Sequence, residues 1–298
     1  METEEKGVYS YNASVKSDAS DELINTYVLR PLAGRLVGAL YRTRVTPNQV
    51  TLAAIVSGFA AAALYTQGTP LLTPLAGLCL TGKDILDSAD GQLARAKGMF
   101  SRAGRFLDSI GDFAVNLAVF SAIAAALFRS GSGEAAPVLC FFAFLGMSLR
   151  VSYHVFYQTS FLHLKKAYAG NRKSEEIREE DAYEDRLTRT LHRTFLILYG
   201  WQDRFIARLD ASCRARSGTP QMTDELWYGD ITGVRLSGFL GLGTELLVLT
   251  ICSVINRLDA YLWINAAGMN FLWLSCIAYR GVVLAGRNRK ISSSGRRS

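Results

Sequence analysis

Charge is segregated along this 298-residue chain, and this pattern constrains the fold more than any other feature of the sequence. A helix needs roughly 20 mostly apolar residues to cross a bilayer. Several apolar stretches reach that length alone, and two others reach it only together with the charged segment between them. The pattern therefore predicts an all-α polytopic membrane protein with six transmembrane helices. The apolar stretches are 50–66, 71–82, 113–128, 135–149, 236–256 and 260–279.

Buried helices of a soluble all-α protein are the alternative interpretation of these stretches. A soluble core rarely keeps a segment as apolar as 236–256 free of polar interruptions. Hydrophobic residues make up 49% of the chain although 20% of it is charged, so the two kinds of residue must be separated in space. The membrane interpretation accounts for that separation.

Basic residues follow every second apolar stretch. The connections 66–70, 129–137 and 256–259 are short and nearly neutral, whereas the opposite connections are basic and the net charge is +7. The positive-inside bias predicts that both termini and the basic connections are cytoplasmic. The expected location is a bacterial inner or plasma membrane. The arginines are not interleaved with aromatic residues on one face, so no nucleic-acid partner is expected. The basic residues before the first apolar stretch, between the second and third, and after the last are Arg30, Arg35, Arg42, Arg44, Arg95, Lys97, Arg102, Arg105, Arg287, Arg289, Lys290, Arg296 and Arg297.

Four segments are predicted in chain order. Residues 1–20 are expected to be a flexible polar N-terminus. Residues 21–45 are expected to be an amphipathic juxtamembrane helix, because apolar residues recur there with a helical period. Thr46-Pro47 supplies a capping residue and a first-turn proline for the first span. The transmembrane domain is expected over 46–282, and a basic disordered tail over 283–298.

A cytoplasmic helical insertion is predicted at 161–235. Within it, the charge-rich run 175–185 is expected to be a solvated helix. Apolar residues between Leu191 and Leu209 form a second amphipathic stripe, which could pack on the helix bundle or lie on the bilayer. The sequence does not separate these two possibilities.

The five cysteines show no paired spacing. Neither a disulfide framework nor a zinc site is therefore expected. The acidic, polar start of the chain lacks the apolar core of a cleavable signal peptide, and none is expected.

Two pairs of aspartates carry the chemistry. Asp87 and Asp90 are three residues apart, and Asp108 and Asp112 are four apart, so each pair lies on one face of a helix. The connection between the pairs is short, which makes the two helices antiparallel neighbours. Four carboxylates should then converge at the cytoplasmic ends of two spans.

Such a cluster of acids is costly near a bilayer unless cations balance it. Carboxylate oxygens suit Mg²⁺ or Mn²⁺, and two such ions can clamp a pyrophosphate. We therefore expect a site for two divalent ions. Helix caps or surface charges are the alternative explanation, but the aspartates follow apolar runs too closely for that.

Small residues lie beside the aspartates. Gly91 and Ala94 follow Asp87 on one helix face and Gly104 precedes Asp108, so that a ligand can approach the backbone. Arg95 offers a guanidinium fork for phosphate or ribose oxygens.

The full pattern is Asp-x-x-Asp-Gly-x-x-Ala-Arg, eight residues, then Gly-x-x-x-Asp-x-x-x-Asp, over residues 87–112. It resembles the defining motif of the CDP-alcohol phosphotransferase (phosphatidyltransferase) family, with every fixed position present. The segment 46–51 is similar to the element that precedes the first span in that family. The resemblance covers roughly residues 22–282.

The resemblance implies a six-helix membrane enzyme of phospholipid biosynthesis, usually a homodimer, with a polar cavity open to the cytoplasm. An acceptor hydroxyl would attack the β-phosphate of a CDP-linked donor, and CMP would leave. The donor could be CDP-diacylglycerol or a CDP-linked polar alcohol. The implied metal ligands are Asp87, Asp90, Asp108 and Asp112, with Asp112 also the general base. The implied nucleotide-binding residues are Gly91, Ala94, Arg95, Gly104 and Asn48.

Three further residues are candidates for binding the acceptor. Lys83 lies with Asp84 inside an apolar stretch, where it could contact a substrate or only neutralise nearby charge. Arg150 and His154 share a helix face, where a cation could bind an acceptor phosphate. Snorkelling of Arg150 to the interface is the alternative.

A different class of function is a multi-pass metal-ion transporter with an acidic intramembrane site. That hypothesis gives no reason for Gly91, Ala94, Arg95 and Gly104. The enzyme is therefore the preferred prediction.

Overall fold

The computed structural model describes Tyr11, Glu22 and residues 24–165, 175–216, 223–284 and 286. Within these residues the chain is helical and contains no strand, which confirms the all-α class. Most of the predicted polar N-terminus and of the basic tail lies outside the described residues. The helices are η2 (Asn25–Leu29), α2 (Arg30–Leu40), α3 (Pro47–Gln67), α4 (Leu72–Lys97), α5 (Arg102–Leu127), η3 (Phe128–Ser132), α6 (Ala135–Leu164), η4 (Glu179–Tyr183), α7 (Arg186–Arg216), α8 (Asp224–Tyr228), α9 (Ile231–Gly238), α10 (Leu242–Val254), α11 (Leu258–Trp263), η5 (Ile264–Met269), α12 (Asn270–Ala278) and η6 (Tyr279–Leu284).

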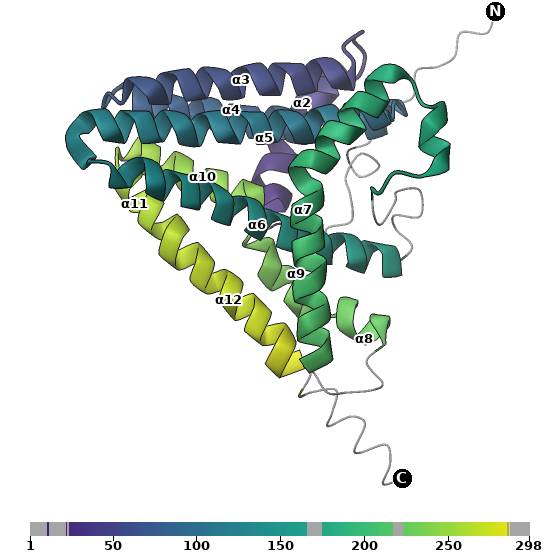
Figure 1. The fold of residues 1–298 in the computed structure, drawn as a ribbon. Helices are drawn as coiled ribbons and strands as arrows, with labels where there is room; N and C mark the ends of the chain where they lie inside the picture. The colour runs from purple at the N-terminus through teal and green to yellow at the C-terminus, as the bar shows by residue number, and fades with distance from the viewer. Residues whose placement is uncertain are drawn as a thin grey trace, which may run out of the picture.

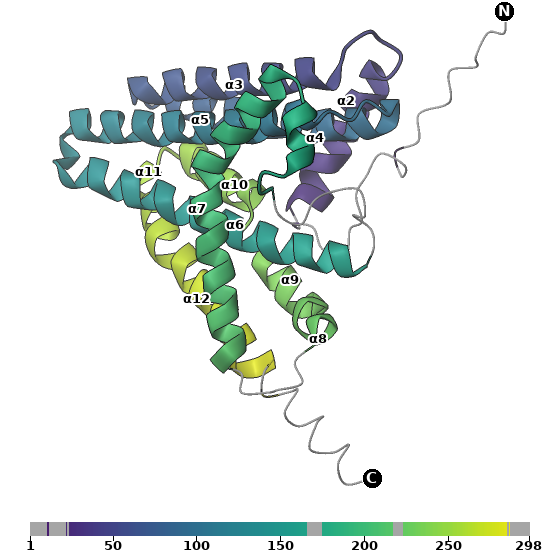
Figure 2. The same cartoon turned by 45° about the vertical axis from the view of Figure 1, so that its right-hand side comes forward.

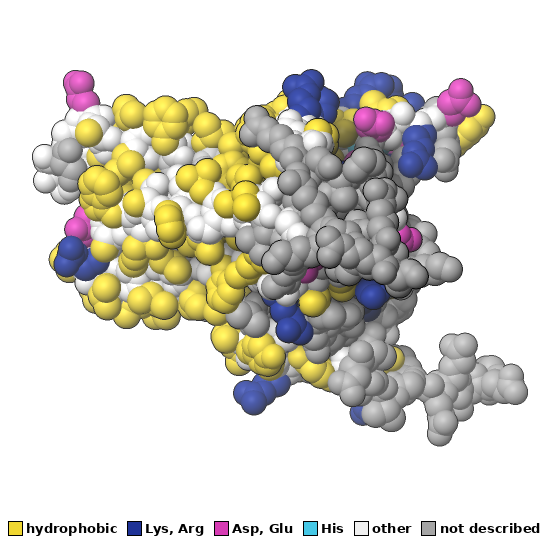
Figure 3. All heavy atoms as spheres, turned by 90° about the horizontal axis from the view of Figure 1, so that it is seen from below, with side chains coloured by type: hydrophobic (Ala, Val, Ile, Leu, Met, Phe, Trp, Pro, Cys, Tyr) yellow, Lys and Arg dark blue, Asp and Glu magenta, His cyan; other side chains and the backbone are white. Residues whose placement is uncertain are grey.

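Among the described residues, five helical segments are long and apolar enough to cross a membrane, where the sequence predicts six. The sixth expected span corresponds to α4, which has 26 residues but carries ionisable side chains along its second half. Figure 3 shows hydrophobic side chains over one half of the face seen from below, with a few charged side chains at the outer end of that half. The five segments are Pro47–Gln67, Arg102–Gly131, Ala135–Leu164, Asp224–Val254 and Leu258–Val282.

The layer of α3, α4 and α5 carries the predicted motif. The three helices lie side by side, and the short connections after α3, α5 and α10 gather at one end of the molecule (Figure 1). The start of α3 follows the prediction. The Thr46 hydroxyl accepts a hydrogen bond from the backbone N–H of Gln49, and the Gln49 side-chain oxygen accepts one from the backbone N–H of Thr46. Pro47 occupies the first turn, where its missing N–H costs nothing. The juxtamembrane helix is continuous from residue 24 to Leu40.

Small residues allow α3 and α5 to approach each other closely. Gly58 of α3 faces Val115 of α5, and Gly111 of α5 faces Ile55 of α3, so a Cβ on either glycine would overlap the opposite side chain. Glycines at helix contacts are a known way of packing spans tightly in lipid. On the other side of the layer, Tyr65 and Ser253 share a hydrogen bond of 2.6 Å that links α3 to α10.

The insertion contributes one long helix, α7, which runs across the long axes of α3, α4 and α5 in both views (Figures 1 and 2). Its inner residues Phe195, Ile206 and Leu209 pack against the bundle. The packing alternative for the amphipathic stripe is therefore correct for this face of the helix.

Replacing Gly58 with Ala should destabilise the protein by about 1–3 kcal/mol, because the new methyl group overlaps Val115 in a packed contact. The measurement is the melting temperature of the purified protein in detergent. Gly82→Ala is the matched control, since a Cβ there meets nothing within 4 Å. An equal loss in both variants would contradict the contact.

Candidate active site

The short connection between α4 and α5 positions the acidic motif. Gly98 ends α4 with φ of +64°, a left-handed conformation that favours glycine. Ser101 then caps α5 by accepting a hydrogen bond from the N–H of Gly104 at 3.1 Å. The two helices consequently run antiparallel with their aspartates facing one another.

Three of the four predicted aspartates form one cluster. Carboxylate oxygens of Asp87, Asp90 and Asp108 all lie within 4.8 Å of one another. Asp90 is buried and accepts a hydrogen bond from the hydroxyl of Thr51 on α3. Like charges this close repel strongly unless a cation balances them. The all-oxygen donor set suits a hard divalent ion.

Asp112 lies beside this cluster and pairs with Lys83. The buried Lys83 ammonium contacts Asp112 and is 3.6 Å from Asp84 and 3.9 Å from Asp87. A fully buried ammonium needs such carboxylate partners. Of the two roles considered for Lys83, this geometry favours charge neutralisation.

The predicted nucleotide-binding residues gather at the end of the same layer. Gly104 faces Asn48 so closely that a Cβ would lie 2.5 Å from the Asn48 side-chain oxygen. The Arg95 guanidinium folds over Gly91, with Nη1 3.4 Å from the position of a Cβ there. None of these residues, nor Ala94, is fully buried, so a ligand can reach them.

Arg150 and His154 lie elsewhere, inside the contact of α6 with α9, α10 and α12. Arg150 is 0% exposed and forms an ion pair of 2.9 Å with Glu245, and it also donates to Asn270 at 2.7 Å. The His154 Nδ1 lies 3.2 Å from the Ser237 hydroxyl. Their partners Glu245, Asn270 and Ser237 belong to α10, α12 and α9, and not to the layer of α3, α4 and α5 that carries the aspartates. Arg150 therefore forms a buried ion pair and does not snorkel to the interface, which was the alternative considered for it.

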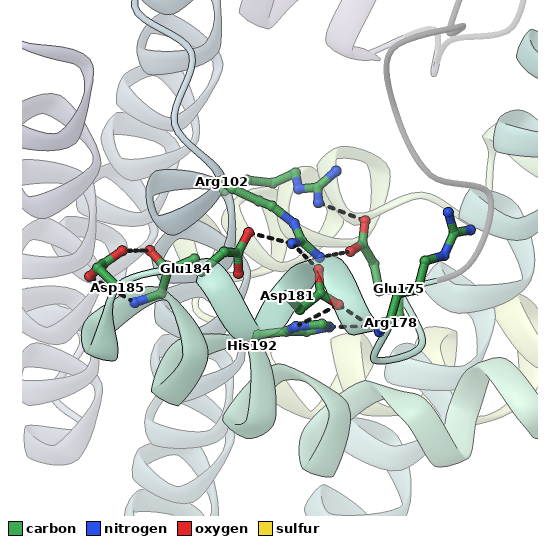
Figure 4. Close-up of polar contacts among 9 residues, drawn as sticks. Arg102, Glu175, Arg178, Asp181, Glu184, Asp185 and His192 are labelled. Atoms are coloured by element: carbon green, nitrogen blue, oxygen red, sulfur yellow. Dashed lines mark hydrogen bonds and ion pairs between the residues drawn. The ribbon is translucent and has the colours of Figure 1, made fainter.

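The insertion reaches the motif through contacts that the sequence did not indicate. Arg102 donates to Asp181 at 2.7 Å, to Glu175 at 3.2 Å and to Glu184, and Arg105 donates to Glu175 at 2.6 Å (Figure 4). The prediction of a solvated helix over 175–185 is therefore wrong. Three of its acids, Glu175, Asp181 and Glu184, pair with the two arginines instead, and only the 3₁₀ turn η4 is helical.

The start of α7 also contacts α5 and the segment that begins at Glu175. The His192 ring stacks on Phe106 of α5 at 4.9 Å between centroids, and its Nε2 lies 2.6 Å from the backbone oxygen of Glu175. Asp185 caps α7 by accepting hydrogen bonds from Thr188, and these hold the pKa of Asp185 below its usual value. Oxygens and nitrogens of Asp181, Glu184 and His192 also lie within 4.8 Å of one another, but Arg102 already supplies the balancing charge there.

Comparison with known proteins finds a family model that covers the motif. Residues 44–173 match the family model described as CDP-alcohol phosphatidyltransferase. The chain is 35% identical over 143 residues to a "Bifunctional IPC transferase and DIPP synthase" of Archaeoglobus fulgidus, covering 48% of this chain and 26% of that protein. It is 33% identical over 135 residues to the protein of the same name from Thermococcus kodakarensis, covering 45% and 29%. The matched region thus spans less than a third of either relative.

Arg102→Gln should release the segment 175–192 from α5, because three carboxylates lose their common partner. We expect amide hydrogen exchange in 175–192 to rise at least tenfold, which corresponds to about 1.4 kcal/mol of lost local stability. The matched control is Arg257→Gln, which removes an exposed pair with Asp259 and should change exchange only locally. Unchanged exchange at 175–192 in Arg102→Gln would contradict the role of the Arg102 ion pairs in holding this segment on α5.

Arg150→Met should destabilise the protein by about 3–5 kcal/mol, because it leaves the Glu245 carboxylate buried without its cation. In the double variant Arg150→Met/Glu245→Leu the loss should be smaller than the sum of the two single losses. Melting temperatures of the three variants give this coupling. Additive losses would argue against the pair.

Proposed function

We propose that this chain, in which residues 44–173 match the CDP-alcohol phosphatidyltransferase family model, transfers an alcohol phosphate from a CDP-linked donor to an acceptor hydroxyl and releases CMP. The observation that carries the proposal is the convergence of Asp87, Asp90 and Asp108, with Asp112 adjacent, on two antiparallel helices within that domain.

The residues fit a site for divalent metal ions. Asp87, Asp90 and Asp108 would be ligands, with Asp112 sharing one ion, and the ions would be Mg²⁺ or Mn²⁺. When bound, two such ions neutralise the pyrophosphate and stabilise the charge that develops on its oxygens. Thr51 holds Asp90 in orientation through its hydrogen bond.

The protein's own groups bind and orient the substrates. Arg95 would pair with donor phosphate or ribose oxygens, and Asn48 would contact the cytidine nucleotide. The backbone at Gly91, Ala94 and Gly104 lets the nucleotide lie close to the two helices. Lys83 supplies a positive charge beside Asp112.

The reaction is one displacement at phosphorus. The acceptor oxygen forms a bond to the β-phosphorus of the donor, and the bond from that phosphorus to the bridging oxygen breaks. CMP leaves with the bridging oxygen. Asp112 takes the proton of the acceptor hydroxyl.

The choice of donor remains between two arrangements. In one, CDP-diacylglycerol transfers its phosphatidyl group to a small polar alcohol such as inositol phosphate or glycerol phosphate. In the other, a CDP-linked polar alcohol reacts with a lipid or a second soluble alcohol. The substrates of the two named relatives belong first in a panel of donors and acceptors.

We further propose a homodimer with six spans, in which α4 is the sixth and both termini and the active site face the cytoplasm. The charge distribution supports this sidedness, since Arg95, Lys97, Arg102 and Arg105 all lie at the end of the layer that carries the motif. Glycosylation or cysteine-accessibility mapping at the connection 68–71 and at 98–101 tests it.

Asp112→Asn should lower CMP release at least 100-fold, because the acceptor proton loses its base. CMP is measured after incubating the purified chain in lipid nanodiscs with the donor and acceptor panel and Mg²⁺. Chelation of divalent ions should abolish release, and added Mg²⁺ or Mn²⁺ should restore it. Asp259→Asn, an exposed residue paired with Arg257, is the matched control and should retain activity. Metal uptake into proteoliposomes without CMP release from any donor would favour the transporter instead.

A further inference from the structure

The inner face of α7 is fully engaged with the bundle. Tyr199 donates to the backbone oxygen of Ser109 on α5 at 2.8 Å. The buried Gln202 accepts from Ser152 of α6 at 2.7 Å. Asp210 accepts from Tyr157 at 2.6 Å and from Trp227 at 2.7 Å. These contacts fix the rotation of α7, and with it the face that points outward.

The outward face carries large apolar side chains in one stripe. Ile197, Trp201 and Phe205 are spaced by four residues and are 75%, 41% and 43% exposed. Residues at this spacing lie one above the other on a helix. None of them belongs to a hydrophobic core cluster of the described residues, so the stripe is unusual for a helix in contact with water alone.

Arginines lie on the same face as this stripe. At 100° per residue, Arg193, Arg204 and Arg208 point in the same direction as Ile197, and all three are exposed. None forms an ion pair with any residue in the described parts of the chain. Of the acidic residues in α7, Asp210 is buried and only Asp203 is exposed.

The helix also has the right position and direction for a membrane surface. It crosses the long axes of α3, α4 and α5 (Figures 1 and 2), so it lies close to the plane of a bilayer that those three helices cross. Its contact with Ser109 places it level with Asp108, at the end of the layer that carries the charges. An aromatic and aliphatic stripe flanked by arginines is typical of helices in the headgroup region, where long arginine side chains reach the phosphates.

We propose that the outward face of α7 docks on the surface of an anionic lipid bilayer. Ile197, Trp201 and Phe205 enter the acyl boundary, and Arg193, Arg204 and Arg208 bind lipid phosphates. This inference does not depend on the proposed reaction. The insertion thus has a lipid-facing side as well as the side that packs on the bundle.

The test measures the environment of Trp201 in the full-length protein. The chain has four tryptophans, so the contribution of Trp201 is the difference in fluorescence between wild type and Trp201→Phe. Nanodiscs of phosphatidylglycerol or of phosphatidylcholine, each with brominated acyl chains, serve as the membrane probe, and aqueous iodide serves as the water probe. The triple variant Arg193→Gln/Arg204→Gln/Arg208→Gln tests the charges, with Arg257→Gln as control.

We expect the Trp201 contribution to fall at least twofold with brominated phosphatidylglycerol, less with brominated phosphatidylcholine, and little with iodide. The triple variant should lose the difference between the two lipids, and Arg257→Gln should keep it. Quenching by iodide without quenching by bromine would overturn the proposal. Equal quenching in both lipids would overturn the preference of this face for an anionic lipid. Resistance to both probes in particles that contain two chains would assign the face to a second copy instead.

Discussion

The crowding of carboxylates on α4 and α5 is the constraint on which the rest of the structure depends. Asp87, Asp90 and Asp108 approach within 4.8 Å where two apolar helices meet, and such charges persist there only with positive partners. Lys83 meets part of that need from within α4. The glycine contacts between α3 and α5 and the caps of α3 and α5 hold the helices, and with them these carboxylates, in fixed positions relative to one another.

The sequence predicted those parts of the structure that depend on local spacing. The capped start of α3 at Thr46, the short connection between α4 and α5 and the facing of the two aspartate pairs all follow from short-range rules of helix geometry. Pairings between distant residues did not follow. Arg150 and Glu245 are 95 positions apart, and no periodicity within either helix indicates that they meet. Similarly, Glu175 in a charge-rich run gives no sign that Arg102 and Arg105 attract it.

The number of spans shows a different limit of prediction. Composition identifies five helical segments in the described part of the chain, because α4 carries the charges of the site itself. A helix that lines an active site in a membrane has a polar face by necessity. The same residues that reveal the chemistry therefore hide the span from a measure based on hydropathy.

The buried carboxylate of Asp210 has a consequence for the order of biosynthesis. It accepts hydrogen bonds from Tyr157, made before α7, and from Trp227 and Tyr228, made after it. While a ribosome is still producing the chain, α7 has only one of these three donors available. The full set of hydrogen bonds to Asp210 can therefore form only after α8 has been translated.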